Sequence, residues 1–108
     1  MARRVENRLA GADANPYLAM AATLAAGLAG MEERRAPGEP VQDNGYDLPR
    51  ALPRTFSTAH EQMAQSGHAA RLLGERFVRA YLAVKALEHD HFLNEISAWE
   101  RRFLLPQV

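Results

Sequence analysis

The chain contains no cysteine, so it can form no disulfide framework, and a reducing cytoplasmic setting is the default expectation. Its 13 lysines and arginines balance its 13 aspartates and glutamates, which leaves no global field to attract nucleic acid or anionic lipid. Aromatic residues make up 7% of the sequence, and none alternate with basic residues as a base-stacking surface requires. We therefore expect no nucleic-acid partner.

The chain also has no long, strongly apolar run. Residues 14–31 carry no charge, but they are mostly alanine and begin with Asn15 and Pro16, whereas a membrane span needs about 20 predominantly apolar residues. A secretory signal is disfavoured as well, because Glu6 and Asp13 interrupt the approach to this run. We expect no membrane partner.

The uncharged run predicts a helix from about Pro16 to Glu33. Asn15 is a suitable N-cap, and Pro16 suits the first helical position because its missing N–H is not needed there. A helix that is small or apolar on every side has to be buried on every side, and 108 residues offer few other apolar elements to cover it. We expect that the chain lacks neighbouring structure, and that alone it is poorly soluble or self-associates.

The pentad at residues 4–8, Arg-Val-Glu-Asn-Arg, predicts a short strand over residues 4–9. The alternation of side chains along a strand places Arg4, Glu6 and Arg8 on one face. A carboxylate between two guanidiniums suits a site that handles a hard cation and an anion together. The alternative is an exposed edge strand whose Arg and Glu side chains form an ion-pair ladder.

Residues 36–56 are rich in proline and glycine and predict a long loop. Asn44 and Gly45 are suited to a tight turn within it. We expect Tyr46 and Leu48 to anchor this loop on the surface of the rest of the protein.

Residues 57–108 predict three helical pieces, of which the last is the longest. Ser57 is the expected cap of a helix ending at Gln65, and a second piece is expected from Ala69 to Leu73. An amphipathic helix then begins near Glu75, and the tail from Ser97 could extend it. Its apolar stripe could face either the core of this chain or a partner subunit.

Four potential metal ligands stand together at residues 88–91, Glu-His-Asp-His. Glu88 and His91 have the i, i+3 spacing of di-metal helix bundles, but such sites need a second helix with the same pattern. His89 and His91 diverge on a helix and cannot easily share one metal. A solvated helix face is the better interpretation.

Several of these segments resemble the C-terminal end of the glutamine synthetase catalytic domain. The likeness is carried by the pentad, by Gly-Ala-Asp-Ala-Asn-Pro-Tyr-Leu at residues 11–18, by the alanine-rich run that follows, and by Asn-Gly-Tyr-Asp-Leu-Pro at residues 44–49. Ser-Ala-Trp-Glu-Arg at residues 97–101 looks like the γ-glutamylputrescine synthetase branch.

The resemblance implies a fold that is mainly α with one or two short β-strands, a C-terminal fragment of an α+β catalytic domain. Residues 1–108 would form one partial domain, divided into an active-site strand and buried helix at 1–35, the loop at 36–56 and the C-terminal helices at 57–108. The C-terminal helices would contact neighbouring subunits of a homo-oligomer.

The resemblance also implies roles for the pentad. Glu6 would be a ligand of an active-site Mg²⁺ or Mn²⁺, and Arg8 would be the catalytic and substrate-binding contact to glutamate or its acyl phosphate. Arg4 would lie on the nucleotide side, with Arg3 a second candidate for nucleotide binding. Forming γ-glutamyl phosphate from ATP accumulates negative charge, which metal ions and guanidiniums offset.

The implied activity is that of the C-terminal portion of an ATP-dependent glutamate–amine ligase. Its substrates would be glutamate, ATP, and ammonia or a primary amine such as a polyamine. Asn7 replaces an aliphatic residue usual in the ammonia-using enzymes, which favours a polyamine. We expect the isolated chain to be inactive, because one carboxylate cannot hold magnesium against its hydration shell. The alternative is a non-catalytic helical fragment that retains an oligomerisation surface.

Overall fold

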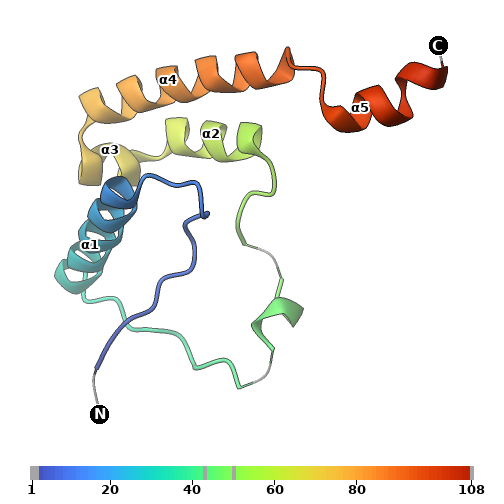
Figure 1. Ribbon diagram of the computed structural model, residues 1–108. Helices are drawn as coiled ribbons and strands as arrows, with labels where there is room; N and C mark the ends of the chain where they lie inside the picture. Colours follow the sequence, from blue (N-terminus) through green and yellow to red (C-terminus); the bar gives the residue numbers. More distant parts are fainter. Residues whose placement is uncertain (1–2, 43, 50, 108) are drawn as a thin grey trace.

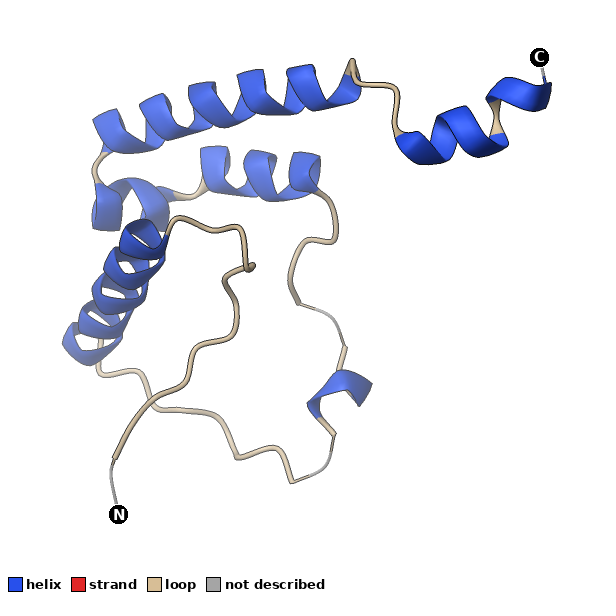
Figure 2. Ribbon diagram, in the orientation of Figure 1, coloured by secondary structure: helices blue, strands red, loops and turns tan. Residues whose placement is uncertain are grey.

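The computed structural model describes residues 3–42, 44–49 and 51–107, and all regular structure in that part is helical (Figures 1 and 2). The predicted mainly α fold is therefore confirmed. In chain order the elements are α1 (Pro16–Glu32), the 3₁₀ turn η1 (Gly45–Asp47), α2 (Phe56–Gln65), α3 (Gly67–Leu73), α4 (Glu75–Leu93), α5 (Ala98–Phe103) and the 3₁₀ turn η2 (Leu105–Gln107).

The strand predicted over residues 4–9 is not formed. The segment is irregular, and the described part of the chain contains no strand at all (Figure 2). A strand is stabilised by ladder hydrogen bonds to a neighbour, and no neighbouring strand lies within the described residues to supply them. The expectation of one or two short strands is therefore wrong for this chain.

Helix α1 follows the prediction closely. The side-chain carbonyl of Asn15 accepts the backbone N–H groups of Tyr17 and Leu18 at 3.0 and 3.2 Å, and Pro16 takes the first helical position. The helix ends at Glu32, one residue before the expected end. No helix in the described ranges is long and apolar enough to cross a membrane.

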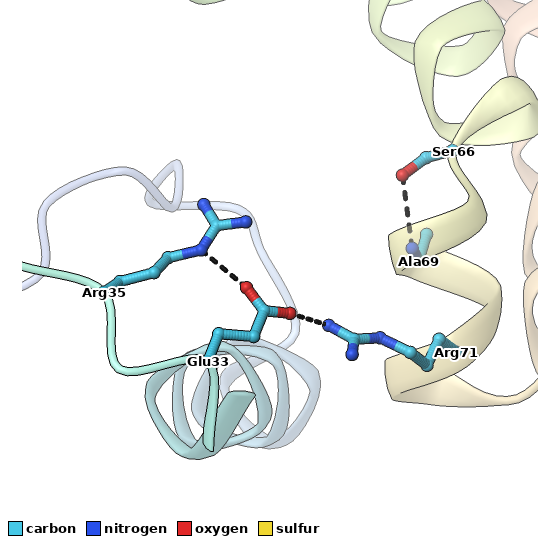
Figure 3. A network of polar contacts seen from close by, with 5 residues as sticks. All are labelled: Glu33, Arg35, Ser66, Ala69 and Arg71. Atoms are coloured by element: carbon cyan, nitrogen blue, oxygen red, sulfur yellow. Dashed lines mark hydrogen bonds and ion pairs between the residues drawn. The ribbon is translucent and has the colours of Figure 1, made fainter. Parts of the chain in front are cut away.

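The C-terminal helices correct the predicted cap of α2, and α3 begins at Gly67, two residues before the predicted Ala69. The hydroxyl of Thr55, not Ser57, accepts the N–H of Thr58 at 3.2 Å, so α2 begins one residue before Ser57. Thr55 has the extended backbone that an N-cap needs, whereas Ser57 lies inside the first turn. Ser66 ends α2 and also caps α3, accepting the N–H of Ala69 at 3.2 Å (Figure 3).

The tail does not extend the long helix. Helix α4 stops at Leu93, and Ser97 starts the separate helix α5 through a capping box. The Ser97 hydroxyl accepts the N–H of Glu100 at 3.1 Å, and the Glu100 carboxylate accepts the N–H of Ser97 at 2.7 Å. The side chain of Ser97, and to a smaller extent its backbone N–H, stabilise the ionised Glu100 carboxylate and lower the pKa of Glu100.

The loop between α1 and α2 contains the expected turn at Asn44 and Gly45. The carbonyl of Asn44 accepts the N–H of Asp47 at 3.1 Å, which closes the 3₁₀ turn η1. Leu48 is half exposed within this chain, at 50%, and its role as an anchor stays a prediction. The side chain of Tyr46, the other expected anchor, lies outside the described residues.

The helices pack as a short chain of neighbours. Helix α1 contacts α3, α3 contacts α4, and α2 lies along α4, while α5 packs mainly on η2 and extends away from the rest (Figure 1). Glu33, just after α1, binds Arg35 at 2.6 Å and Arg71 of α3, so a carboxylate held by two guanidiniums links α1 to α3 (Figure 3). The hydrogen bonds from Arg71 and then Arg35 lower the pKa of Glu33.

The burial expected for α1 is not provided within this chain. Ala29 is its only buried residue among those described, and the side chains of Leu24 and Leu28 are 68% and 60% exposed. The accessible surface is 10427 Å², against about 6000 Å² for a folded monomer of this mass. The radius of gyration is 18.3 Å, against about 13 Å for a compact domain of this length.

We expect the isolated chain to self-associate, because apolar side chains along α1 are exposed to water. Size-exclusion chromatography with light scattering should show masses above the 12.0 kDa monomer that rise with concentration. Thermal unfolding followed by circular dichroism should be broad, since few tertiary contacts link the helices. A monodisperse monomer with a sharp, cooperative transition would show that the chain is a complete domain.

We expect the Glu33 carboxyl to titrate below its usual pKa of 4.5. A lowered folded-state pKa stabilises the α1–α3 contact above the unfolded pKa, and that contribution is lost as the pH falls through the folded value. Carbon-13 NMR of the glutamate carboxyls in a dilute sample should show the depressed midpoint. Arg71→Ala should raise it towards 4.5, while Arg102→Ala on α5 should leave it unchanged. A midpoint at or above 4.5 in the unaltered chain would contradict this assignment.

Candidate functional site

The pentad lies on the segment that leads into α1, and two of its charged side chains meet. The Nε of Arg8 donates to Oε1 of Glu6 at 2.6 Å, and the two side chains are 85% and 59% exposed. Residues two apart share a face of an extended backbone, so the predicted grouping of Glu6 with Arg8 occurs even though no strand is formed. A guanidinium beside an accessible carboxylate can present both charges to a ligand.

The other two arginines stand apart from this pair. Arg3 and Arg4 are exposed, and within the described residues neither forms an ion pair. The structure therefore brings together Glu6 and Arg8 but not the whole predicted set. Their assigned roles in binding nucleotide, substrate and metal remain predictions.

Asn7, between the paired residues, points its side chain to α1. Its Nδ2 donates to the hydroxyl of Thr23 at 3.0 Å, and its Oδ1 accepts the N–H of Leu9 at 3.0 Å. The Thr23 hydroxyl in turn donates to the carbonyl of Ala19 at 2.8 Å. The pentad is thus fastened to the helix that Asn15 and Pro16 begin.

The metal-binding capacity of these residues is incomplete. Carboxylate oxygens suit Mg²⁺ or Mn²⁺, and Glu6 keeps one oxygen free of the contact with Arg8. Over the described ranges, however, no group of three or more His, Cys, Asp or Glu side chains is placed to hold a metal ion. Glu6 could therefore supply one ligand of a metal site but cannot form the site with its neighbours here.

The residues at 88–91 are instead divided among separate contacts. Glu88 accepts from Lys85 at 2.5 Å, and this bond is the main reason that the pKa of Lys85 is raised. The ring of His89 stacks on Phe56 with centroids 4.5 Å apart, and its Nε2 lies 3.5 Å from the hydroxyl of Ser57. The segment contributes to the packing of α2 on α4.

Sequence reasoning missed the part that histidines play in that packing. The Nε2 of His60 donates to the main-chain carbonyl of Leu82 at 3.0 Å, which ties α2 to α4. Phe56 lies between the two histidine rings, with centroids 5.8 Å from His60 and 4.5 Å from His89. No sequence signal indicated this packing, because the pairing depends on how two helices align.

Helices α1 to α4 line an open, mostly apolar groove of about 1000 Å³. Its floor is formed by alanines of α1, and its other wall includes Phe77, Tyr81 and Val84 of α4. Asp13 and Lys85 also line it, and Asp13 contributes to the raised pKa of Lys85. At this groove no other part of the described chain covers the uncharged side chains of α1.

Comparison with known proteins shows which family this chain resembles. Residues 1–104 match the family described as glutamine synthetase, catalytic domain. The chain belongs to the glutamine synthetase family. The glutamine synthetases of Staphylococcus epidermidis (strain ATCC 12228) and Staphylococcus aureus (strain N315) are each 33% identical to it over 116 residues, covering 99% of this chain and 26% of the relative. No solved structure matches the chain.

Membership of the glutamine synthetase family supports part of the predicted identity. These relatives are ligases by name, and the chain spans about a quarter of their length. The family match covers the pentad, α1 and the C-terminal helices together. Neither relative bears on the γ-glutamylputrescine branch, so the choice of amine rests on the sequence pattern at Asn7 and residues 97–101.

Proposed function

We propose that residues 1–108 act as the C-terminal portion of an ATP-dependent ligase that joins glutamate to ammonia or a primary amine. In this reaction the γ-carboxylate of glutamate takes the γ-phosphoryl group of ATP and releases ADP. The amine then attacks the acyl carbon, and phosphate leaves. The observation that carries the proposal is the contact of Glu6 with Arg8 in a segment that matches the glutamine synthetase catalytic domain.

Each residue of the pentad has a role that its chemistry supports. Arg8 would bind the glutamate substrate and the acyl phosphate, because its planar fork matches carboxylate and phosphate oxygens. Glu6 would contribute one ligand to a Mg²⁺ or Mn²⁺ site completed by the rest of the enzyme. Arg4, with Arg3 beside it, would neutralise phosphates of ATP. Binding and orientation account for the chemistry, so none of these side chains needs to act as a nucleophile.

The proposed setting follows from the same assignment. We place the ligase in the cytoplasm, as a homo-oligomer that uses ATP and a divalent cation. The exposed apolar residues of α5, Trp99 and Phe103 at 60% and 45%, are suited to a subunit contact. The sequence left open whether the apolar residues of the C-terminal end face the core of this chain or a partner subunit. In this proposal they face a partner subunit.

A second candidate function is supported by the same exposed surface. A short helical protein that keeps the apolar faces of α1 and α5 could bind full-length subunits without catalysing a reaction. The DNA upstream of Met1 discriminates between the two proposals. An uninterrupted frame encoding the missing metal ligands and nucleotide site favours the ligase, whereas a genuine start site at Met1 favours the interaction fragment.

We expect the amine acceptor of the parental ligase to be a polyamine or another primary amine. Asn7 and the Ser-Ala-Trp-Glu-Arg pattern at residues 97–101 motivate this expectation. Steady-state assays of the full-length enzyme with ammonia and with putrescine should give the higher kcat/KM for putrescine. A clear preference for ammonia would defeat the polyamine assignment and leave the ligase assignment in place.

In the parental ligase, Glu6→Ala should lower metal-dependent turnover by on the order of a hundred-fold or more, because charge that develops in the transition state loses part of its stabilisation. Arg8→Lys removes at least one charge-assisted hydrogen bond worth ~1.5–3 kcal/mol, which corresponds to about ten- to a hundred-fold in kcat/KM. Arg102→Lys on α5 is the matched control and should change little.

The isolated chain should make no γ-glutamyl product with either amine, since Glu6 and Arg8 alone offer one metal ligand and one anion clamp. Turnover by the isolated chain would contradict this view of the site. Near-normal turnover of the parental Glu6→Ala enzyme would remove the metal-ligand role and return the pentad to an ordinary ion-pair ladder.

A further inference from the structure

Both polar atoms of the Asn7 side chain form hydrogen bonds within the protein. Its Oδ1 accepts the N–H of Leu9, and its Nδ2 donates to Thr23, which itself donates to the carbonyl of Ala19. The Thr23 hydroxyl has one hydrogen, and that hydrogen points to Ala19, so the lone pairs of its oxygen can only accept. The amide of Asn7 therefore has one orientation that satisfies every partner, with its NH₂ group towards α1.

This chain of hydrogen bonds is the tie between the pentad and α1. Among the described residues, Asn7 to Thr23 is the one side-chain hydrogen bond that joins residues 3–9 to a helix. Thr23 lies in the second turn of α1, which is 17 residues long and capped at its start by Asn15. A residue on a capped helix is a firmer support than the irregular segment that it holds.

We infer that Asn7 and Thr23 are positioning residues, which set the place of Glu6 and Arg8 relative to α1. Asn7 is adjacent in sequence to both, and its side chain bonds to α1 while the side chains of Glu6 and Arg8 bond to each other. An aliphatic side chain at residue 7 could pack on α1 but could not bond to Thr23 or Leu9. Asn7 thus acts on Glu6 and Arg8 through the backbone that joins the three residues.

The inference rests on the proposed function, because that function gives a fixed Glu6–Arg8 pair its purpose. The hydrogen bond between Asn7 and Thr23 can also be tested without measuring enzyme activity. The absence of cysteine allows two spin labels to be attached without background, at Val5→Cys in the pentad and at Leu24→Cys on α1. Both native side chains are largely exposed, at 93% and 68%, so labels there displace no core residue.

The first experiment measures the distance between these labels by pulsed electron paramagnetic resonance in the isolated chain, diluted with unlabelled protein. The unaltered pair and Thr23→Ser, which keeps the hydroxyl, should give the same narrow distribution. Thr23→Val has the same shape without the hydroxyl. This variant should lose the narrow distribution and give a broad distribution of label distances. A narrow, unshifted distribution in Thr23→Val would overturn the inference.

The second experiment measures kinetics of the parental ligase. A displacement of about 1 Å at a reacting group can cost on the order of a hundred-fold, so Thr23→Val should lower kcat by about ten- to a hundred-fold, and Thr23→Ser should restore it. The KM for the amine should stay unchanged, because the side-chain bonds of Asn7 go to Thr23 and Leu9. A raised amine KM with normal kcat would overturn the positioning role in favour of direct recognition.

Failure of the inference and failure of the proposed function are distinguishable. The label distance tests the tie between Asn7 and Thr23 without any reaction, whereas Glu6→Ala tests the metal-ligand role by turnover alone. Loss of the narrow distance distribution in Thr23→Val, together with a lowered kcat, supports the inference. Loss of the narrow distribution with an unchanged kcat shows that the hydrogen bond to Thr23 exists but does not position the site. That result overturns the inference.

Discussion

The structure depends on one constraint, which is that α1 carries no charged side chain between its cap and Met31. Such a helix gains stability by removing its surface from water, and α3 together with the rest of this chain covers only part of it. The incomplete burial of α1 accounts for three observations: the open groove between α1 and α4, the large accessible surface and the extended shape. The chain matches about a quarter of the length of its relatives.

Polar contacts, rather than a core, hold the arrangement in place. The Glu33 carboxylate between Arg35 and Arg71 joins α1 to α3, and His60 and His89 join α2 to α4. Exposed contacts of this kind are individually weak, so they set relative positions more than they stabilise the fold. The Asn7–Thr23 bond belongs to the same class, and it bears on the candidate site because it acts on the residue between Glu6 and Arg8.

Local chemistry explains which elements could be predicted. Asn15 and Pro16 start α1 where expected because capping involves only a few consecutive residues. Thr55 displaced Ser57 as a cap because both residue types are suitable and the backbone conformation decides between them. The tail became a separate helix because Ser97 and Glu100 form a capping box that an amphipathic stripe does not reveal. The predicted strand failed for the opposite reason, since its stability depends on partners distant in sequence.

The sequence by itself determined the helical class, the charge pattern of the pentad and the membership of the glutamine synthetase family, because each follows from residue type and order along the chain. It also placed Glu6 and Arg8 on one face, since the alternation of an extended backbone needs no partner. Only the tertiary structure decided that Asn7 faces Thr23, that His60 and His89 pack α2 on α4, and that Glu33 binds Arg71. These contacts join residues many positions apart, and their formation depends on how the helices align in space.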